Sequence, residues 1–285
     1  MANARILLKR RKSARNTRKI TRTMELVASA KLRKAEEAAA RARPYAEGLS
    51  RVLGRIAPNC PNHPLLIERP IKKVVILVAA SDRGLCGSYN TNIVRRAIES
   101  AKVYEGKGAS VEFIALGRKG ASLLKFQGRT PASAHRGLIE KAHPERITAL
   151  LKPLVERYTT GEIDRVEIAF AQKSGPLHKP AVMTLLPCTA PKIEGQRADH
   201  GAYLAEPEVE TIVAAMVPMV VMANIRNAIL DTAAGEHSAR RIAMKNATDS
   251  ADDLIRALTL HYNRLRQAKI TQEIAEIVGA VEAMA

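Results

Sequence analysis

The loop "SDRGLCGSYN", Ser81 to Asn90, holds the residue types that most resemble a site of chemistry. A glycine-rich turn after an apolar run could cradle a phosphate, but Gly84 and Gly87 lack the GxGxxG spacing and no P-loop Lys-Ser/Thr pair follows. Cys86 in "CGSY" could be a protease nucleophile, but nothing marks a partner His and Asn. The remaining interpretation is a strand-to-helix turn, in which Gly84 and Gly87 permit close backbone approach and Cys86 packs as a small hydrophobe. We favour this turn and expect no catalytic residue in it.

The three cysteines, Cys60, Cys86 and Cys188, lie far apart and form no CxxC pair. This spacing predicts reduced thiols in a reducing compartment. Cys60 and His63 would make half of a metal site, but no second pair has suitable spacing. We therefore expect neither a metal nor a cofactor.

The segment from Leu7 to Met24 carries eight Lys or Arg residues and no acid. The net charge of the chain is +18, yet residues 1–60 hold 16 basic against 4 acidic residues, whereas residues 207–285 hold 8 against 10. The positive charge thus belongs mainly to one N-terminal element. Nucleic acid, a membrane, a targeting receptor and an acidic protein are all partners for such a segment.

A basic nucleic-acid-binding protein with a helical arm is the main alternative function, because the cations from Arg5 to Arg22 could neutralise phosphates. Aromatic residues make up only 3% of the chain and Trp is absent, which argues against a platform that stacks single-stranded bases.

A solvated surface without any partner is a further alternative for Arg5 to Arg15. A transit peptide is disfavoured because the apolar pattern continues into a long helix. No long apolar run suggests a bilayer span, so we expect a soluble or peripheral protein.

The apolar period of the first segment predicts one long helix. Its seam residues follow one another at alternating steps of four and three: Met24, Ala28, Lys31, Ala35, Ala38, Ala42, Tyr45, Leu49, Val52 and Ile56. Alanine on this coiled-coil seam lets a partner helix approach closely. Pro44 should kink the helix, and the prolines of "APNCPNHP" should end it.

The last segment has the same character and predicts a second long helix from Pro207. Its seam is predicted at Ala251, Leu254, Leu258, His261, Leu265 and Ala268, and after a change of phase at Ile270, Ile274, Ile277, Val281 and Met284. The two terminal helices can pair only if they run antiparallel.

Between the helices the period changes to that of strands and shorter helices. "KKVVILVAA", "SVEFIALG", "DRVEIAFAQ" and "AVMTLLPC" indicate strands, with helices predicted in "TNIVRRAIESAKVY" and "PERITALLKPLVERY". This alternation predicts a parallel, Rossmann-like α/β domain. The expected fold class is α/β, with an antiparallel coiled coil of N- and C-terminal helices added to that domain. The expected parts are an N-terminal helix over 1–57, the α/β domain over 70–190, a linker over 191–206 and a C-terminal helix over 207–285.

Three motifs in this order resemble the signatures of the gamma subunit of F-type ATP synthase. They are "KITRTMELVASAKLRKA" at Lys19–Ala35, "SDRGLCGSYNTNI" at Ser81–Ile93 and "RQAKITQEIAEIVGA" at Arg266–Ala280. The resemblance covers nearly the whole chain. Arg11 stands where the family usually has Ile, and Gly235 stands where the family usually has Ser.

The resemblance implies a non-catalytic central-stalk rotor that transmits torque between a membrane-embedded ring of c subunits and a hexamer of alpha and beta subunits. It also implies contact with the epsilon subunit, no nucleic acid, and peripheral attachment at the cytoplasmic face of the bacterial plasma membrane only through the complex. Contacts to beta-subunit loops and the hexamer sleeve are implied for Arg18, Lys19, Arg22, Met24, Arg266, Gln267, Thr271, Ile274, Ile277 and Val281.

Overall fold

The computed structural model describes residues 2–60, 62–140, 142–175, 177–188, 206 and 208–284. The chain divides into two compact units, one of Met1–Ser29 with Arg240–Ala285 and one of Ala30–Ala239. Helices α1 (Ala2–Ile56) and α5 (Val209–Met284) contribute to both units. The predicted linker over 191–206 lies, apart from Glu206, outside the described residues.

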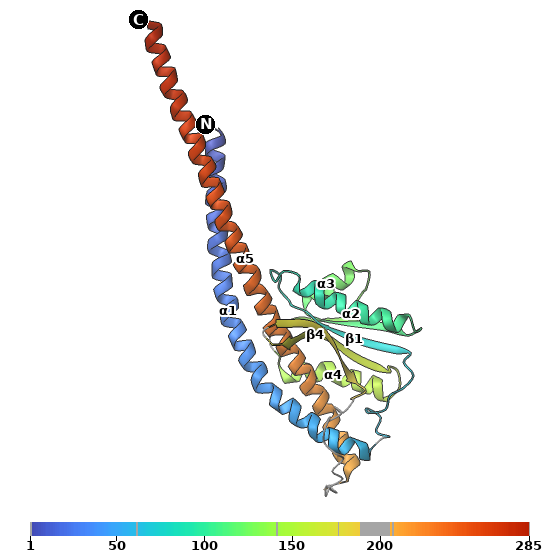
Figure 1. The fold of residues 1–285 in the computed structure, drawn as a ribbon. Coiled ribbons are helices and arrows are strands. Elements are labelled where there is room, and N and C mark those ends of the chain that lie inside the picture. Colours follow the sequence, from blue (N-terminus) through green and yellow to red (C-terminus); the bar gives the residue numbers. More distant parts are fainter. Residues whose placement is uncertain are drawn as a thin grey trace. The chain divides into compact units, whose positions relative to one another are not determined.

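A five-stranded sheet with the order β3-β2-β1-β4-β5 lies at the centre of the second unit (Figure 1). Strands β1 (Lys73–Ala79), β2 (Ser110–Leu116), β3 (Ser133–His135) and β4 (Arg165–Ser174) are parallel, and β5 (Leu177–Leu186) pairs antiparallel with β4. The order of the parallel strands is that of a doubly wound fold. The predicted Rossmann-like domain is therefore confirmed, while the antiparallel edge strand was not foreseen.

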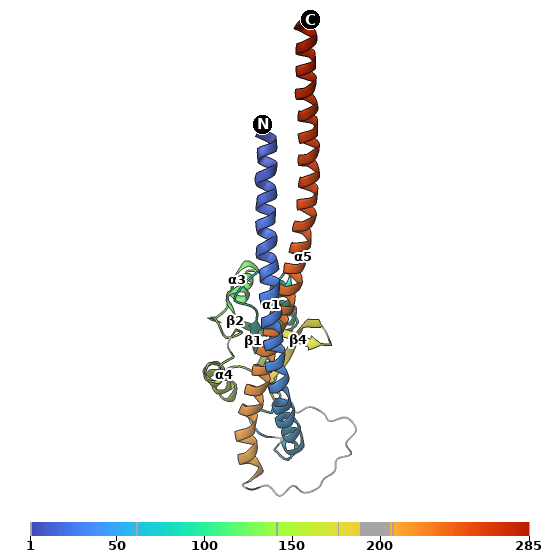
Figure 2. The ribbon, with the colours of Figure 1, turned by 90° about the vertical axis from the view of Figure 1, so that its left-hand side faces the viewer.

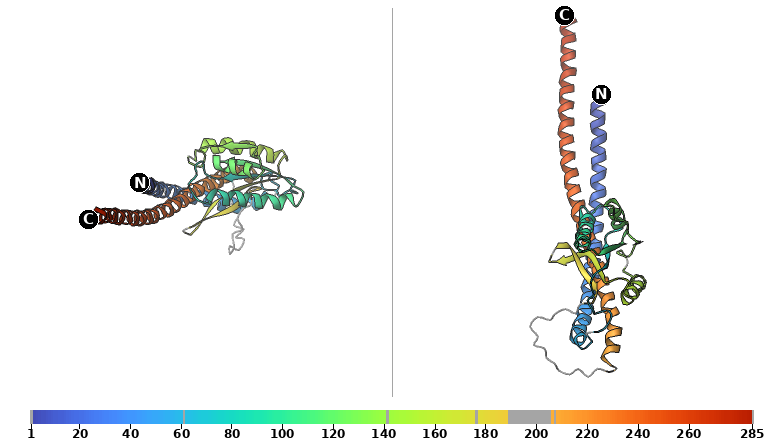
Figure 3. Two further views of the ribbon diagram at one scale, coloured as in Figure 1. Left: turned by 90° about the horizontal axis from the view of Figure 1, so that it is seen from above. Right: turned by 90° about the vertical axis from the view of Figure 1, so that its right-hand side faces the viewer.

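Helices cover both faces of this sheet, as the view from above shows (Figure 3). On one face, α2 (Tyr89–Glu105) and α3 (Arg118–Phe126) pack on Val74, Ile76 and Val78. On the other face, α4 (Pro144–Thr159) and the N-terminal part of α5 pack on Val75 and Leu77. Residues pointing alternately to the two faces of β1 thus serve two separate cores, which explains why the strand is apolar throughout.

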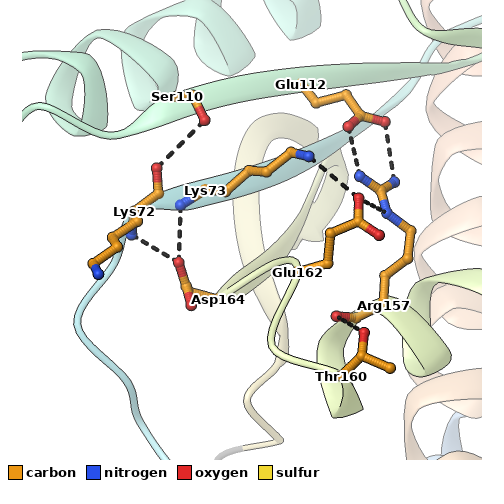
Figure 4. A network of polar contacts seen from close by, with 8 residues as sticks. All are labelled: Lys72, Lys73, Ser110, Glu112, Arg157, Thr160, Glu162 and Asp164. Carbon is orange, nitrogen blue, oxygen red and sulfur yellow. Dashed lines mark hydrogen bonds and ion pairs between the residues drawn. The ribbon is translucent and has the colours of Figure 1, made fainter.

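A network of ion pairs ties α4 to the amino ends of the parallel strands (Figure 4). Arg157 donates to both carboxylate oxygens of Glu112 at 2.8 and 3.2 Å, and its Nε donates to Glu162 at 2.8 Å. Lys73 Nζ reaches the same Glu162 at 3.2 Å. Asp164 accepts two successive backbone N–H groups at the start of β1, at 2.8 and 2.9 Å. The planar fork of the arginine fixes the orientation of α4 as well as its distance from the sheet.

Helices α1 and α5 pair antiparallel within each unit (Figure 2). In the second unit Arg43 of α1 forms an ion pair with Asp231 of α5 at 3.3 Å. In the first unit Arg18 pairs with Asp252 at 2.6 Å. The predicted antiparallel coiled coil is confirmed. Pro44 lies inside α1, and the helix runs on to Ile56.

The predicted seams had the right period but partly the wrong phase. The buried positions of α1 are Leu7, Ala14, Thr21, Ala28, Ala39, Ala46 and Leu53. They repeat every seven residues except for one step of eleven, because a straight helix drifts by about 20° per heptad and must correct its phase. Tyr45 and Val52, predicted on the seam, are 56% and 47% exposed.

The seam of α5 is displaced by one residue at two positions. Ile255 and Tyr262 face inward, and the predicted Leu254 and His261 are exposed. The reason lies in the partner helix, because the Arg11 guanidinium stacks 5.4 Å from the Tyr262 ring centroid. That contact draws Tyr262 onto the seam and also gives a physical role to Arg11, the residue that departs from the family pattern.

Part of α5 is apolar enough to cross a membrane by length and composition, with a mean hydropathy of 1.7 over its most apolar window. The expectation that no segment reaches this level was wrong. The larger apolar residues on one face of this part of α5 are buried in the core that α4 and the sheet share, namely Val213, Val217, Val220, Val221, Ile225 and Ile229. Their hydrophobicity therefore serves the core of the second unit.

The two compact units each include parts of both terminal helices, so they are a different kind of division from the predicted segments of the sequence. The predicted domain boundaries remain a prediction.

Gly235 of α5 meets the sheet domain so closely that an added Cβ would lie 3.1 Å from Ala171, His178 and Tyr89. We expect Gly235→Val to lower the free energy of unfolding by about 1–3 kcal/mol through overpacking. Gly279→Val is the matched control, because no atom lies within 4 Å of its Cβ position. Thermal and urea unfolding measure both variants, and equal stabilities would contradict the close contact.

His178 of β5 has both ring nitrogens buried without a hydrogen-bond partner among the described residues. Burial and the charge of Lys173 lower the pKa of this imidazole below 6.5, against the opposing effect of the Asp231 and Glu36 carboxylates. The unfolded chain binds the proton more readily than the folded chain. The free energy of unfolding is therefore highest above the pKa that this histidine has in the unfolded chain, and it falls as the pH drops below that value.

We expect His178→Phe to raise stability by about 1–2 kcal/mol and to flatten its pH dependence between about pH 7 and pH 5. The matched control is His261→Phe at an exposed position of α5. Urea midpoints across this pH range test the expectation, and an unchanged slope in the His178 variant would refute it.

Candidate functional site

Three basic residues of α1 gather on one surface of the first unit. Arg18, Lys19 and Arg22 line a cavity of about 550 Å³ together with Thr23 of α1 and with Thr248, Asp249 and Asp252 of α5. Two of the cations are already paired, since Arg18 binds Asp252 and Arg22 binds Glu25 at 2.9 Å. Lys19 forms no ion pair with any residue that the structure describes. The surface therefore carries two arginines held in ion pairs and one lysine in no ion pair with a described residue, beside the carboxylates of Asp249 and Asp252.

A buried pair of hydroxyl groups sets the register of the helices beneath these cations. Thr248 Oγ1 lies 2.8 Å from Thr21 Oγ1, and both side chains are buried. Each hydroxyl also lies within hydrogen-bond distance of a carbonyl of its own helix, Thr21 at 3.1 Å from Arg18 O and Thr248 at 2.8 Å from Met244 O. The two hydroxyl hydrogens are shared among these three contacts, because each hydroxyl donates one hydrogen. Thr21 continues the heptad of Leu7, Ala14 and Ala28, and this spacing is the signal by which sequence analysis could have found it.

The predicted contact residues of α5 form a separate group. Arg266, Gln267 and Thr271 are all exposed. Fourteen residues separate Asp252 from Arg266, which corresponds to about 21 Å along the helix. The structure thus brings Arg18, Lys19 and Arg22 together, with half-buried Met24 just beyond them, but it does not join them to the α5 group.

The C-terminal end of α5 carries an apolar stripe. Ile274, Ile277, Val278 and Val281 are 56%, 65%, 52% and 63% exposed. Their spacing places them on one face of the helix. The pairing of Arg11 with Tyr262 puts the start of α1 opposite residues near Thr271, so no described residue of α1 packs on the stripe (Figures 1 and 2). Such a row of exposed aliphatic side chains is typical of a surface that a partner covers.

The Ser81–Asn90 segment forms the turn between β1 and α2. Gly87 has a φ of +58°, a left-handed conformation that favours glycine, whereas Cβ at Gly84 would meet Lys119 at an ordinary 3.5 Å. Cys86 is buried and accepts from Asn90 Nδ2 at 3.2 Å, and Asn90 Oδ1 accepts from the Ser81 backbone N–H at 2.9 Å. The donor of Ser81 that a phosphate would need is therefore already satisfied within the turn.

Helix α5 occupies the carboxyl ends of β1 and β4, where folds of this strand order usually bind their ligands. Tyr89 Oη donates to the carbonyl of Thr232 at 2.6 Å, and Thr232 Oγ1 accepts from the Ala171 N–H at 3.4 Å. Gly235, one turn on, keeps the backbone of α5 in close contact with the same residues. The crevice between these strands is filled by the helix.

The cysteines and acids do not assemble into a metal site in the described part of the chain, where no group of three or more His, Cys, Asp or Glu side chains occurs. Cys60, Cys86 and Cys188 are buried free thiols, and burial raises the pKa of Cys188 to about 11. Thiols held in this way are weakly nucleophilic.

Comparison with known proteins gives consistent matches over the full length. The family model described as ATP synthase matches residues 3–284. The ATP synthase gamma chain of Pelotomaculum thermopropionicum is 40% identical, with 100% of both chains covered. That of Gemmatimonas aurantiaca is 38% identical over 100% of this chain and 99% of the relative.

Solved structures share the fold. A chain of the Euglena gracilis mitochondrial ATP synthase rotor has a TM-score of 0.66 and 20% identity, covering 94% of this chain and 99% of that chain. A chain of the same enzyme's OSCP/F1/c-ring structure has a TM-score of 0.67, also at 20% identity, and covers 99% and 95%. With full-length relatives at about 40% identity and a matching family model, the chain belongs to the ATP synthase gamma chain family.

Proposed function

We propose that the chain is the central-stalk rotor subunit of a proton-translocating ATP synthase and has no active site of its own. It would transmit torque between the membrane c-ring and the alpha/beta hexamer, with the epsilon subunit as a further partner. The observation that carries this proposal is the antiparallel pair of long helices in the first unit, exposed at its cationic surface and its apolar stripe. The bacterial origin of the relatives supports a place at the cytoplasmic face of the plasma membrane.

The contacts of the first unit suit a part that must resist twisting. The Thr21–Thr248 hydroxyl pair, the Arg18–Asp252 ion pair and the Arg11–Tyr262 stacking contact lie at successive levels of the two helices. Small residues such as Ala14 and Ala28 on the seam keep the helices close. Several connections spaced along the axis oppose relative sliding better than a single one.

The surface features suit a shaft that turns against other proteins. Free and paired cations at Lys19 and Arg22 would attract acidic loops of beta subunits over a distance of about one Debye length, roughly 8–10 Å. Attraction over that range does not hold the shaft at a single rotation angle, because it needs no directional contact. The stripe at Ile274, Ile277 and Val281 would enter the sleeve of the hexamer, where aliphatic side chains offer contact without directional bonds.

The absence of an active site is supported by the occupied crevice at Thr232 and by the internal bonding of the Ser81–Asn90 turn. The alternative of a nucleic-acid-binding arm is not supported, since the full-length relatives are ATP synthase gamma chains and the basic surface includes Asp249 and Asp252.

Co-purification tests the proposal directly. The chain should travel with ATP synthase alpha and beta subunits in one complex that hydrolyses ATP. A chain that does not co-purify with those subunits but binds duplex DNA tightly at physiological salt would overturn the rotor assignment.

The apolar stripe gives a first prediction. We expect the triple variant Ile274→Gln, Ile277→Gln, Val281→Gln to fold normally, because these side chains are exposed, yet to lower the ATP turnover of the reconstituted complex several-fold. Val103→Gln with Leu177→Gln is the matched control, at positions that are both 57% exposed. Equal losses in both variants, or none in either, would argue against a contact between the stripe and the hexamer.

The cations give a second prediction. Lys19→Glu with Arg22→Glu should slow turnover at low ionic strength, and the difference should shrink as salt screens the charges. Lys107→Glu with Lys125→Glu makes the same change of charge on exposed positions of the second unit. A salt-independent defect, or the same defect in the control, would show that long-range attraction is not the role of Lys19 and Arg22.

A further inference from the structure

Two neighbouring cavities lie along α5 in the second unit. A cavity of about 580 Å³ lies between α1, α4 and α5, and a second of about 330 Å³ lies between α4 and α5. Both are lined by Met219 and Met222, so the two cavities adjoin. We call this feature the α4–α5 groove. Cavities of this size with mainly apolar walls and a few polar groups are typical ligand sites.

One end of the α4–α5 groove is rich in hydrogen-bond donors. Arg226 and Asn227 line it from α5, and Arg41 and Tyr45 line it from α1. Neither Arg226 nor Asn227 forms a hydrogen bond or ion pair with any described residue. Arg41 is held only loosely by Glu37, with its Nε 3.4 Å from the Glu37 carbonyl and a guanidinium nitrogen 3.8 Å from the carboxylate, and no acidic side chain lines this cavity. The donors and the net positive charge suit an anionic head group.

The other end is apolar. Leu151 and Val155 of α4 face Pro218 and Met219 of α5 there, while Lys152 and Glu156 at the edge have opposite charges. The two helices touch beside this slot, because Thr148 Oγ1 lies 3.7 Å from Met222 Sδ. A partner helix, which is about 10–12 Å wide with its side chains, would not enter a slot between helices in contact. A polymethylene chain would, and methionine side chains adapt to such a ligand.

The length of the groove fits the same class of ligand. From Pro218 to Leu230 the groove follows α5 for about 18 Å. We propose that the α4–α5 groove binds a long-chain anionic amphiphile, with its acidic head between Arg226 and Arg41 and its acyl chain along Met219 and Met222. The ligand would be a free fatty acid, because the slot between α4 and α5 takes a single acyl chain. This site is additional to the rotor function and does not depend on it.

The test uses the purified full chain and the fluorescent fatty acid cis-parinarate, with displacement by palmitate. We expect saturable binding of one molecule per chain, displacement by palmitate, and much weaker displacement by uncharged hexadecanol. Arg226→Gln should weaken binding about tenfold or more, because a charged hydrogen bond to the head group is lost. Met219→Gln, at a position 43% exposed, should weaken it by placing an amide in the slot.

Matched controls separate the groove from general attraction to a chain of net charge +18. Arg118→Gln on α3 removes an exposed arginine elsewhere, and Phe126→Gln removes an apolar side chain that is 83% exposed. Both should bind as the unmodified chain does. Non-saturable binding, or groove variants that bind like the controls, would overturn the proposal. Circular dichroism and co-assembly with alpha and beta subunits confirm that each variant is folded and leave the rotor assignment intact.

Flotation with phosphatidylglycerol vesicles tests whether a bilayer lipid occupies the groove instead. Flotation that Arg226→Gln and Met219→Gln abolish assigns the groove to a bilayer lipid, whereas palmitate binding without flotation assigns it to a free fatty acid. Flotation that persists in both groove variants, disappears at high salt and is not accompanied by palmitate binding would reflect net charge alone and contradict the site.

Discussion

Antiparallel packing of α1 on α5 is the constraint on which both compact units depend. In the second unit the Arg43–Asp231 pair holds the helices where α5 also contributes to the core beneath the sheet. In the first unit no sheet is present among the described residues, so the two helices stabilise each other only along their own seam. Small residues and a few specific polar contacts replace a large core there.

The helices and the class of the central domain could be predicted from the sequence because their signals are periodic and long. The strands β1, β2 and β4 are nearly all apolar, which is typical of parallel strands covered on both faces. Strand β3 and helix α3 were missed because both are short, and a short segment carries too few residues to establish a period. The strand-like run at Ala181–Cys188 was found, but Pro180 hid its N-terminal extension, since proline is tolerated only at a sheet edge.

The phase of the seams was harder to predict than their period. Leu254 and Ile255 are adjacent aliphatic residues, and either could begin an inward face. The choice is made by the other helix, through contacts such as Arg11 with Tyr262, and a single-helix pattern does not contain that information. For the candidate site, the resemblance singled out Arg18, Lys19 and Arg22, which lie on one exposed surface, and their contact with a partner stays a prediction. The Thr21–Thr248 pair beneath them is a property of two segments and was not visible in either one.

The bond from Tyr89 to the carbonyl of Thr232 limits what can bind at the carboxyl ends of the strands. A doubly wound sheet normally leaves the mouth between its first and fourth strands open to solvent and cofactor. Here α5 lies at that place, so a nucleotide could bind there only if α5 moved away from Tyr89 and Ala171. The carboxyl ends of the parallel strands can hold either a helix of the same chain or a bound ligand, but not both at once.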